Sequence, residues 1–506
     1  MDYSFFIWSI ATYIEARLKE EIDYSRLERT IGFSYRHIRE TFKECTNISL
    51  SRYILTRRIA NAAFEIIHTN KSLLDISGEY TFNNYDTFTR AFKRYTKITP
   101  SEFRTKGCKV GRYRFLMGMF APVILEENED ILLSNSILEV ENIMKNREKT
   151  DNSCILFGVP KVAYSFEECT PFPTALKACL NYMGQEIDYS YIMATSGAAF
   201  RLRWNINCWD GGNVDIMNIY QDKYEAFKRA FKAAGRTYKI LKREKANKED
   251  FIEFIKSEID EGRPVIALGI IGPPEACLIT GYQNNGETLL GWNCFQENRE
   301  FRKDIKIHES GYFICNTWWE NPATIAVMAV GEEQNQPMDS KDIIEDAIKI
   351  MTTEKICYDS TDSDRKIEYA GGQSAYDAWA NAISDEKEFP KDAILPLLFE
   401  RIMCQGDAQV MVGEGRSYAA CYISWVGNNN EIVADECQQA AKLFKEEAQY
   451  AFKMNEVKGG FMQDEQATRT FAKPDVRKQI VPLINKAKEY DAKACTILKQ
   501  ILTKLK

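Results

Sequence analysis

In the first hundred residues, apolar positions recur at helical spacing in two similar blocks. A short amphipathic segment opens each block, at 24–31 and at 72–80, and a tight break follows it, at 32–34 and at 81–84. Ser34 and Asn84 close these breaks and are suited to cap the start of another helix. Each block therefore predicts a helix, a short turn and a second helix.

The second helix of each block has one apolar face. Ile38 and Phe42 in the first block, and Phe88 and Phe92 in the second, stand four positions apart. This spacing is typical of an amphipathic helix that turns one stripe toward a core. A further apolar pattern over 50–68 predicts a long helix that joins the two blocks.

The two blocks align with each other at an offset of 50 residues. Residues 42–49 match 92–99, and the match continues with Tyr53 over Phe103. Such self-similarity indicates a duplicated structural unit. A helix, a turn and a helix form the helix-turn-helix motif, whose second helix enters the major groove of DNA. Two copies on one connecting helix would place two recognition helices in neighbouring grooves, about 34 Å apart.

The charge of the chain is uneven. Residues 1–107 contain 17 Lys and Arg against 13 Asp and Glu, a balance of +4, whereas the remaining residues contain 49 against 60, a balance of −11. A small basic head on a long acidic body is expected when only the head meets a polyanion. The charge alone is also compatible with an ordinary solvated surface.

Residues 31–43 and 88–104 resemble the DNA-binding domain of the AraC/XylS family of transcription regulators. The second stretch is similar to the family signature that ends in a phenylalanine-lysine pair and a threonine-proline turn, here Phe92-Lys93 and Thr99-Pro100. The resemblance covers residues 3–106 and implies binding of double-stranded DNA. Thr81 stands where the family usually has Gly, which takes a positive φ without strain. We therefore expect a slightly reshaped second turn.

The resemblance also implies which side chains reach the DNA. Positions expected to contact bases are Arg36, Arg39, Glu40, Tyr85, Asp86 and Arg90. Arg can bridge guanine O6 and N7, and Asp or Glu can accept a hydrogen bond from cytosine N4. Phosphate contacts fix the register without carrying sequence information, and the residues suited to them are Ser34, Lys43, Asn84, Lys93 and Arg94.

A different pattern follows the head. Residues 108–150 form an unassigned linker, and from 151 to 335 the chain predicts an α+β domain. Strands are expected at 154–159, 264–268, 275–282 and 288–293, and helices after Cys169 and over 248–261. An Asn-Gly hairpin turn at 283–286 is expected to join the last two strands.

The order of these elements resembles the papain-like cysteine peptidase fold and, more narrowly, the butirosin-biosynthesis acyltransferases. In that fold a Cys at a helix N-terminus is the nucleophile, a His opens a later strand, and an Asn orients the His. The resemblance assigns Cys169 to the nucleophile position and Asn293 to the orienting position. The His position falls on Glu275 or Ala276, and a carboxylate there would oppose formation of the thiolate.

Three interpretations of Cys169 follow. Cys169 is an active nucleophile, or it belongs to an inactive fold that is reused to bind a ligand, or its role is purely structural. The missing His favours the second interpretation. Aromatic side chains offer the walls of a ligand pocket. The predicted ligand-binding residues are Cys169, Trp204, Trp209, Glu275, Trp292 and Asn293.

Residues 336–506 predict an all-α domain. Segments with helical length and periodicity lie at 341–351, 374–383, 393–403, 433–453 and 476–505. The predicted fold is therefore multidomain: an all-α double helix-turn-helix head, an α+β papain-like domain and an all-α C-terminal domain.

The amino-acid composition excludes several classes of protein. Hydrophobic residues make up 45% and charged residues 27% of the 506 positions, which is typical of globular chains. No apolar run is long enough for a transmembrane helix, and the apolar start lacks the features of a signal peptide. The 14 cysteines show no metal-binding spacing and there are only three histidines, so we expect no metal, no cofactor and a cytoplasmic location.

Two classes of function remain. The first is an AraC-type transcription regulator that binds double-stranded DNA and is controlled by a small-molecule or peptide effector in a catalytically inactive papain-like domain. RNA polymerase and a second copy of the chain are further candidate partners, and a membrane is not. The second class is a bifunctional thiol acyltransferase or amidase that uses Cys169 and carries a DNA-binding head.

Overall fold

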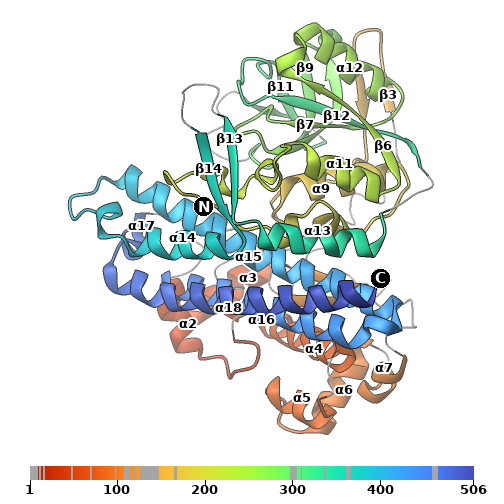
Figure 1. Ribbon diagram of the computed structural model, residues 1–506. Helices are drawn as coiled ribbons and strands as arrows, with labels where there is room; N and C mark the ends of the chain where they lie inside the picture. Colours follow the sequence, from red (N-terminus) through yellow and green to blue (C-terminus); the bar gives the residue numbers. More distant parts are fainter. Residues whose placement is uncertain are drawn as a thin grey trace. The chain divides into compact units, whose positions relative to one another are not determined.

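The protein is described by a computed structural model that covers residues 10, 13–14, 17–46, 49–68, 71–96, 98–106, 114–118, 121–125, 147–164, 168–296, 305–308, 310–334, 338–359, 366–458 and 465–505 (Figure 1). The chain forms two compact units. The helical unit comprises Met1–Leu132, Gly197–Lys223 and Ser340–Lys506, and the sheet unit comprises Leu133–Ser196 and Tyr224–Asp339. No helix in these described ranges is both long enough and apolar enough to cross a membrane.

The head of the helical unit contains two helix-turn-helix motifs, as the repeat predicts. The first consists of α2 (Tyr24–Ile31) and α3 (Tyr35–Thr46), and the second of α5 (Leu73–Glu79) and α6 (Tyr85–Thr96). The long helix α4 (Leu50–His68) joins them, and α7 (Pro100–Lys106) closes the second motif. The predicted stripes Ile38 with Phe42 and Phe88 with Phe92 are fully buried.

The two motifs repeat one packing arrangement. The rings of Phe42 and Tyr53 have their centroids 5.3 Å apart, and those of Phe92 and Phe103, which align with them, are also 5.3 Å apart. Burial of these aromatic rings supplies much of the apolar area that a head of this size can remove from water. The alignment at offset 50 therefore corresponds to a repeated core.

Side-chain caps start the helices at matching places. Ser34 Oγ accepts from the backbone N–H of His37 at 3.4 Å, and Asn84 Oδ1 accepts from that of Thr87 at 2.8 Å. Each cap satisfies one of the backbone donors that a helix start leaves without a partner. Both predicted N-caps are thus confirmed.

The C-terminal ends of α2 and α5, which precede the two turns, differ in conformation. Gly32 takes φ 77° after α2, and its N–H donates to Glu28 O at 2.8 Å. Thr81 takes φ 60° after α5, and the N–H of Phe82 closes the turn onto Ser77 O at 3.1 Å. A β-branched residue in this left-handed region is strained, because its Cβ crowds the backbone. The family glycine is therefore missing at a position whose geometry calls for it.

In its described residues, the sheet unit contains an antiparallel sheet of nine strands. Their order is β10-β11-β9-β8-β7-β12-β6, and β4 pairs with the far end of β8 and with β3. Their bounds are β3 Arg147–Lys149, β4 Cys154–Leu156, β6 Arg236–Lys242, β7 Val265–Leu268, β8 Ala276–Gln283, β9 Thr288–Trp292, β10 Lys306–Ile307, β11 Phe313–Cys315 and β12 Ala326–Glu333. The helices of this unit are α9 (Pro171–Tyr182), α10 (Tyr189–Thr195), α11 (Glu225–Ala233) and α12 (Lys248–Asp260).

The turn between β8 and β9 is longer than the two-residue type that Asn-Gly predicts. Gln283 pairs with Thr288, so four residues form the connection. Asn284, Asn285 and Gly286 all have positive φ, which Asn and Gly tolerate better than other residues. The prediction of a hairpin is confirmed, and its turn type is corrected.

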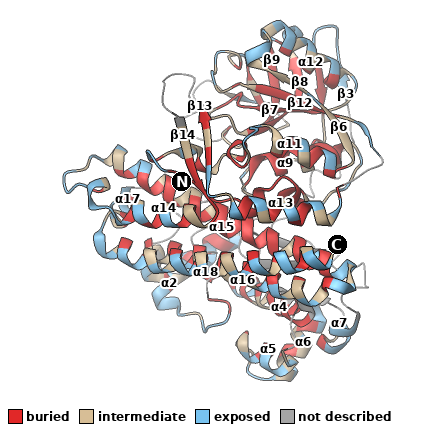
Figure 2. Ribbon diagram, in the orientation of Figure 1, coloured by how far each residue is buried: buried red, intermediate tan, exposed pale blue. Residues whose placement is uncertain are grey.

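The C-terminal part of the helical unit is a helical bundle with a small hairpin. The helices are α13 (Ser340–Thr352), α14 (Gly372–Ser384), α15 (Leu395–Asn429), α16 (Ala434–Lys458), α17 (Glu465–Phe471) and α18 (Pro474–Lys504). The hairpin of β13 (Lys355–Asp359) and β14 (Lys366–Gly371) was not predicted, and it pairs with β5 (Arg203–Asn205). Figure 2 shows α15 as the most deeply buried helix of this bundle.

A buried ionic network fastens residues 197–223 to this bundle. Arg416 on α15 donates to Asp491 on α18 at 2.8 Å and to Glu447 on α16 at 3.1 Å. Its Nη1 also donates to the carbonyl oxygens of Ala199 at 3.0 Å and Arg201 at 3.1 Å. Residues 197–223, which the sequence places in the 151–335 domain, therefore belong to the helical unit, a long-range packing preference that local patterns do not encode.

Of the predicted linker 108–150, three strands are described. β1 (Arg114–Gly118) and β2 (Ala121–Leu125) form an antiparallel hairpin, and β3 begins the sheet of the sheet unit. The acidic run 126–130 lies outside the described residues.

Candidate nucleic-acid interface

The predicted base-contacting residues lie mostly on the exposed faces of α3 and α6. Arg36, Arg39 and Glu40 are exposed on α3, and Asp86 and Arg90 are exposed on α6. These faces are opposite the buried stripes, because residues four apart share one side of a helix. The side chains are therefore available to a ligand that approaches either helix from solvent.

Tyr85 differs from the other predicted base-contacting residues. It is half-buried, and its ring lies with its centroid 6.2 Å from that of Phe88, which is part of the core. The Tyr85 ring therefore contacts the core of the second motif at the start of α6.

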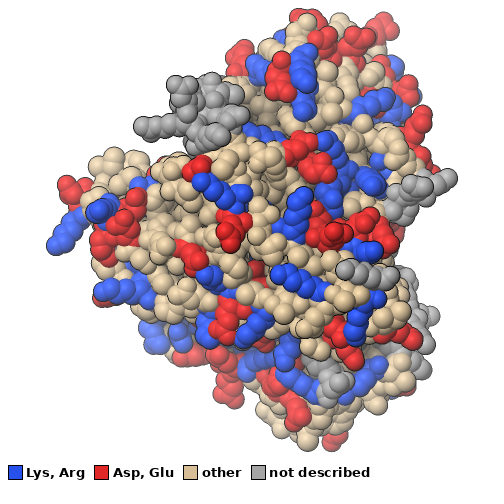
Figure 3. All heavy atoms as spheres, viewed as in Figure 1, with Lys and Arg blue, Asp and Glu red and all other residues tan. Residues whose placement is uncertain are grey.

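The residues expected at phosphates are all exposed. Lys43, Lys93 and Arg94 lie toward the ends of the recognition helices, and Ser34 and Asn84 stand at their starts. Because Ser34 and Asn84 already cap their helices, a phosphate there would meet the positive end of a helix dipole as well as the cap. Over the face drawn in Figure 3, basic and acidic side chains are interspersed.

One ion pair orders the face of α3. Arg36 Nε lies 3.0 Å from Glu40 Oε1, and the two side chains are 83% and 48% exposed. A pair this exposed contributes little stability, so DNA can displace it at small cost. On α6 the arginine is held differently, since Arg90 Nε donates to the backbone oxygen of Asp86 at 3.4 Å.

The predicted ligand-binding residues are divided between the two units. Cys169, Glu275, Trp292 and Asn293 belong to the sheet unit, whereas Trp204 and Trp209 belong to the helical unit. The single pocket lined by all six that the sequence predicts is therefore not built within one unit. This corrects the grouping that their spacing along the chain indicated.

In the helical unit the two tryptophans are core residues. Trp204 is 3% exposed and stacks on Trp379 of α14, with centroids 6.3 Å apart. Trp209 is 8% exposed and donates its indole N–H to Glu388 at 2.9 Å. Both contacts join the 197–223 segment to the C-terminal helices.

In the sheet unit Cys169 is half-buried and stands two residues before Pro171, the first residue of α9. Asn293 is buried directly after β9, and its Nδ2 donates to Gly269 O at 3.1 Å and to Ile271 O at 3.4 Å. Its Oδ1 accepts from the N–H of Phe295 at 2.8 Å. The amide of Asn293 is thus occupied by the backbone of two loops.

The loop that Asn293 holds contains a strained residue that the sequence did not reveal. Ile270 takes φ 70°, is 2% exposed, and donates its N–H to Thr324 Oγ1 at 3.1 Å. A β-branched residue at positive φ persists only where its surroundings fix it, and such positions cluster at functional sites. The loop leads directly into Glu275 and β8, so the strain lies beside a predicted ligand-binding residue.

The buried thiols of the sheet unit are poorly suited to ionise. Burial raises the pKa of Cys179 and of Cys277 to about 12. Burial, together with the charge of Glu275, also raises the pKa of Cys294. These cysteines are therefore protonated near neutral pH and pack as small apolar side chains.

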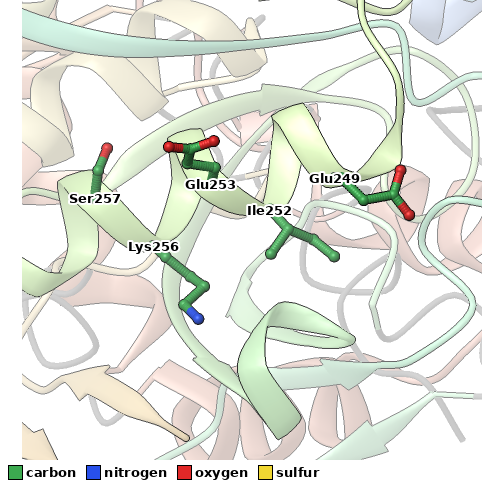
Figure 4. A pocket seen from close by; sticks show the side chains of 5 residues that line it. All are labelled: Glu249, Ile252, Glu253, Lys256 and Ser257. Atoms are coloured by element: carbon green, nitrogen blue, oxygen red, sulfur yellow. The ribbon is translucent and has the colours of Figure 1, made fainter.

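One hollow of the sheet unit lies on the outer side of α12 (Figure 4). Its lining residues all belong to that helix, namely Glu249, Ile252, Glu253, Lys256 and Ser257, and none of them is a predicted site residue. Within the described part of the chain, no group of three or more His, Cys, Asp or Glu side chains is arranged to hold a metal ion.

Comparison with known proteins places the similarity in the head. Residues 27–106 match a family model described as a helix-turn-helix domain. The chain is 33% identical over 98 residues to the TetD protein of transposon Tn10 from Escherichia coli, which covers 19% of this chain and 71% of that protein. It is 31% identical over 110 residues to the multiple antibiotic resistance protein MarA of Escherichia coli, covering 22% and 86%.

Longer proteins are matched over a smaller share of their length. The chain is 31% identical over 104 residues to the transcriptional regulator Rob of Salmonella typhimurium, and the match spans 21% of this chain and 36% of Rob. A solved AraC-type transcriptional regulator from Chromobacterium violaceum is 24% identical, with a TM-score of 0.20, over 21% of this chain and 95% of that one.

Proposed function

Since the chain belongs, through its helix-turn-helix head, to the AraC family of transcription regulators, we propose that it is a sequence-specific DNA-binding regulator whose remaining residues bind a small molecule or peptide that controls it. The observation that carries the proposal is the repeated motif, in which two capped helices of equal length turn charged side chains to solvent. In a helix-turn-helix protein these are the faces that meet base edges in the major groove.

Base readout is assigned to the exposed arginines and acids of α3 and α6. Arg36, Arg39 and Arg90 have the planar donors that bridge guanine O6 and N7, and Glu40 and Asp86 can accept from cytosine N4. Tyr85 adds a hydroxyl at the start of α6. Ser34, Lys43, Asn84, Lys93 and Arg94 supply phosphate contacts, which set the register on the duplex.

A gel-shift titration tests this assignment. An oligonucleotide pool is first selected with the full chain, and the affinities of Arg39→Ala and Arg90→Ala are then compared on the selected site and on random duplex. Each substitution is expected to weaken specific binding by about 1–3 kcal/mol and to relax the base preference locally. The matched control, Lys43→Ala, should weaken binding to both duplexes alike and reduce the salt dependence.

Equal losses of Arg39→Ala and Arg90→Ala on the selected site and on random duplex would show that these arginines meet only phosphate. Failure of any sequence to enrich would reject sequence-specific recognition altogether.

We further propose that the region 151–335, whose order of elements resembles the papain-like fold, binds the effector without catalysis. In the resemblance Glu275 falls at the His position, where a carboxylate would oppose a thiolate. Asn293 falls at the orienting position, and its amide donates to Gly269 and Ile271 and accepts from Phe295. Coupling of the ligand to DNA requires two states with different affinities and is typically worth about 1–3 kcal/mol.

The alternative function is a thiol acyltransferase or amidase with a DNA-binding head, and the place of Cys169 just before α9 favours it. A helix start stabilises a nearby thiolate. Rapid stoichiometric reaction with iodoacetamide at neutral pH, lost together with turnover in Cys169→Ser, would support the enzyme. Slow labelling, with an unimpaired effector response in the same variant, would support the sensor.

A further inference from the structure

The two recognition helices have the same length and the same capping position, but their charged residues stand in opposite order. α3 and α6 are both 12 residues long and begin directly after a capping residue, Ser34 or Asn84. The second and sixth positions of α3 are Arg36 and Glu40, and those of α6 are Asp86 and Arg90. The basic and acidic positions are therefore exchanged between the two copies.

Helix stability explains the order on α6 but not the order on α3. An acid in the first turn and a base one turn later complement the helix dipole, as with Asp86 and Arg90. Arg36 and Glu40 have the reverse and less favourable order, although they form a direct ion pair at 3.0 Å. Because Arg36 is 83% exposed, packing does not require it there either. Contact with a base supplies a reason for an arginine at this position.

We propose that the two helices select the same pair of bases in opposite order. Counted from the N-terminus of each helix, α3 places guanine first, at Arg36, and cytosine second, at Glu40, whereas α6 places cytosine first, at Asp86, and guanine second, at Arg90. The inference rests on the proposed function and adds to it the order of the two bases in each half-site.

The spacing of the two bases follows from helix geometry. Four residues advance a helix by about 6 Å. Stacked base pairs are about 3.4 Å apart, so the arginine and the acid of one helix meet bases about two steps apart. Arg to guanine and Asp or Glu to cytosine are the pairings that the donors and acceptors of the major groove favour. Each half-site therefore contains one guanine and one cytosine position, and their order differs between the half-sites.

Charge-exchange variants of the full chain test the proposal. In Asp86→Arg/Arg90→Asp the order on α6 becomes that of α3, and in Arg36→Glu/Glu40→Arg the order on α3 becomes that of α6. Neither variant changes the net charge, so the general attraction to DNA is retained. Sites are selected from a random duplex pool with the wild type and with both variants.

The wild type is expected to select two segments in which guanine and cytosine stand in opposite order relative to the helices. Each variant should exchange the two bases in one segment only, and should prefer its own site over the wild-type site by about tenfold. Unchanged base preferences in either variant, or the same order in both wild-type segments, would overturn the proposal. If the wild type enriches no sequence, the proposed function itself fails.

A second pair of variants tests the proposal even if the helices with exchanged charges fold poorly. Arg36→Ala and Arg90→Ala each keep a strong helix former and should relax the guanine preference at one position, in different half-sites. Loss of preference at equivalent positions of both half-sites, counted from the helix starts, would contradict the opposite order.

Discussion

Replacing Thr81 by Gly should stabilise the second helix-turn-helix motif. Thr81 follows α5 with φ 60°, and the hydrogen bond from the N–H of Phe82 to Ser77 O fixes the chain in that turn. The hydroxyl oxygen of Thr81 is buried, and it has no hydrogen-bond partner among the described residues. The substitution would relieve the left-handed strain and remove the buried hydroxyl.

The size of the gain can be worked out from these features. Left-handed backbone at a non-glycine residue costs about 1–2 kcal/mol. A buried hydroxyl without a partner costs about 1 kcal/mol or more. Against this, glycine loses about 0.5–1 kcal/mol more backbone entropy on folding. Removal of the methyl group loses about 0.8 kcal/mol of apolar burial. The net gain expected for Thr81→Gly is therefore about 1 kcal/mol.

Amide hydrogen exchange in the full chain measures this gain locally, because it reports the opening free energy of α5 and α6 themselves. Exchange there should slow about fivefold in Thr81→Gly. The reciprocal control is Gly32→Ala in the first motif, where a Cβ would have no atom within 4 Å and only the φ of 77° opposes it. Exchange in α2 and α3 should accelerate. Unchanged or faster exchange in Thr81→Gly would refute the strain argument.

Three further substitutions probe the rest of the chain. Lys458→Met should change the pH dependence of the stability of the helical unit, because Lys458 is 1% exposed and burial, opposed in part by the charge of Asp407, lowers its pKa to about 7, against about 10.4 in the unfolded chain. The unfolded chain binds more protons between these values, so wild-type stability should rise from pH 7 to about pH 10 and the variant should lose that slope, as urea titrations at several pH values would show. Gly291→Ala should destabilise the sheet unit by more than about 3 kcal/mol in a thermal melt, since its Cβ would lie 1.8 Å from Leu278 O; a loss below 1 kcal/mol would contradict that crowding. Asn293→Ala should cost about 3 kcal/mol and accelerate amide exchange around residues 269–275, and an unaltered loop would show that the amide does not hold it.

The head could be predicted from the sequence because its signals are local. Caps at Ser34 and Asn84 and apolar pairs four residues apart fix where α3 and α6 begin and which side they bury. The same spacing predicts which side chains stay exposed, and among the residues predicted to contact bases only Tyr85 is half-buried, since its ring also contacts Phe88. The resemblance to the AraC family singled out Thr81 as the position of a reshaped turn, and the positive φ of Thr81 lies there.

Four of the five predicted C-terminal helices correspond to α13, α14, α16 and α18, whereas α15 was harder to predict because its signals depend on distant partners. The pattern indicated a helix over 393–403, whereas α15 extends over Leu395–Asn429. The added part contains Gly413, Gly415 and Gly427, which lower helix propensity, and it is buried on several sides, so it lacks a polar face. Packing against α16, α17 and residues 198–214 stabilises it instead.

The ligand-binding set was partly misgrouped for a related reason. Spacing along the chain suggested that Trp204, Trp209 and Trp292 share one domain, but the segment 197–223 is bound to the C-terminal helices through Arg416. Arg416, which lies 217 residues after Ala199, joins this segment to the bundle together with the pairing of β5 with β14 and the stacking of Trp204 on Trp379.

Comparison of aligned positions in the two helix-turn-helix motifs distinguishes residues that packing constrains from residues that a ligand would constrain. Core positions keep their chemistry across the repeat, as Phe42 and Phe92 do, because a core of fixed volume tolerates few alternatives. Caps keep their function with different residues, since any short polar side chain can accept from the helix start. Arg36 and Asp86 align yet have opposite charge, and neither is constrained by the core. If both helices met equivalent DNA, the same charge would serve at both positions. The exchange of charge therefore argues that the two halves of the DNA site differ in sequence and that each helix is adapted to its own half.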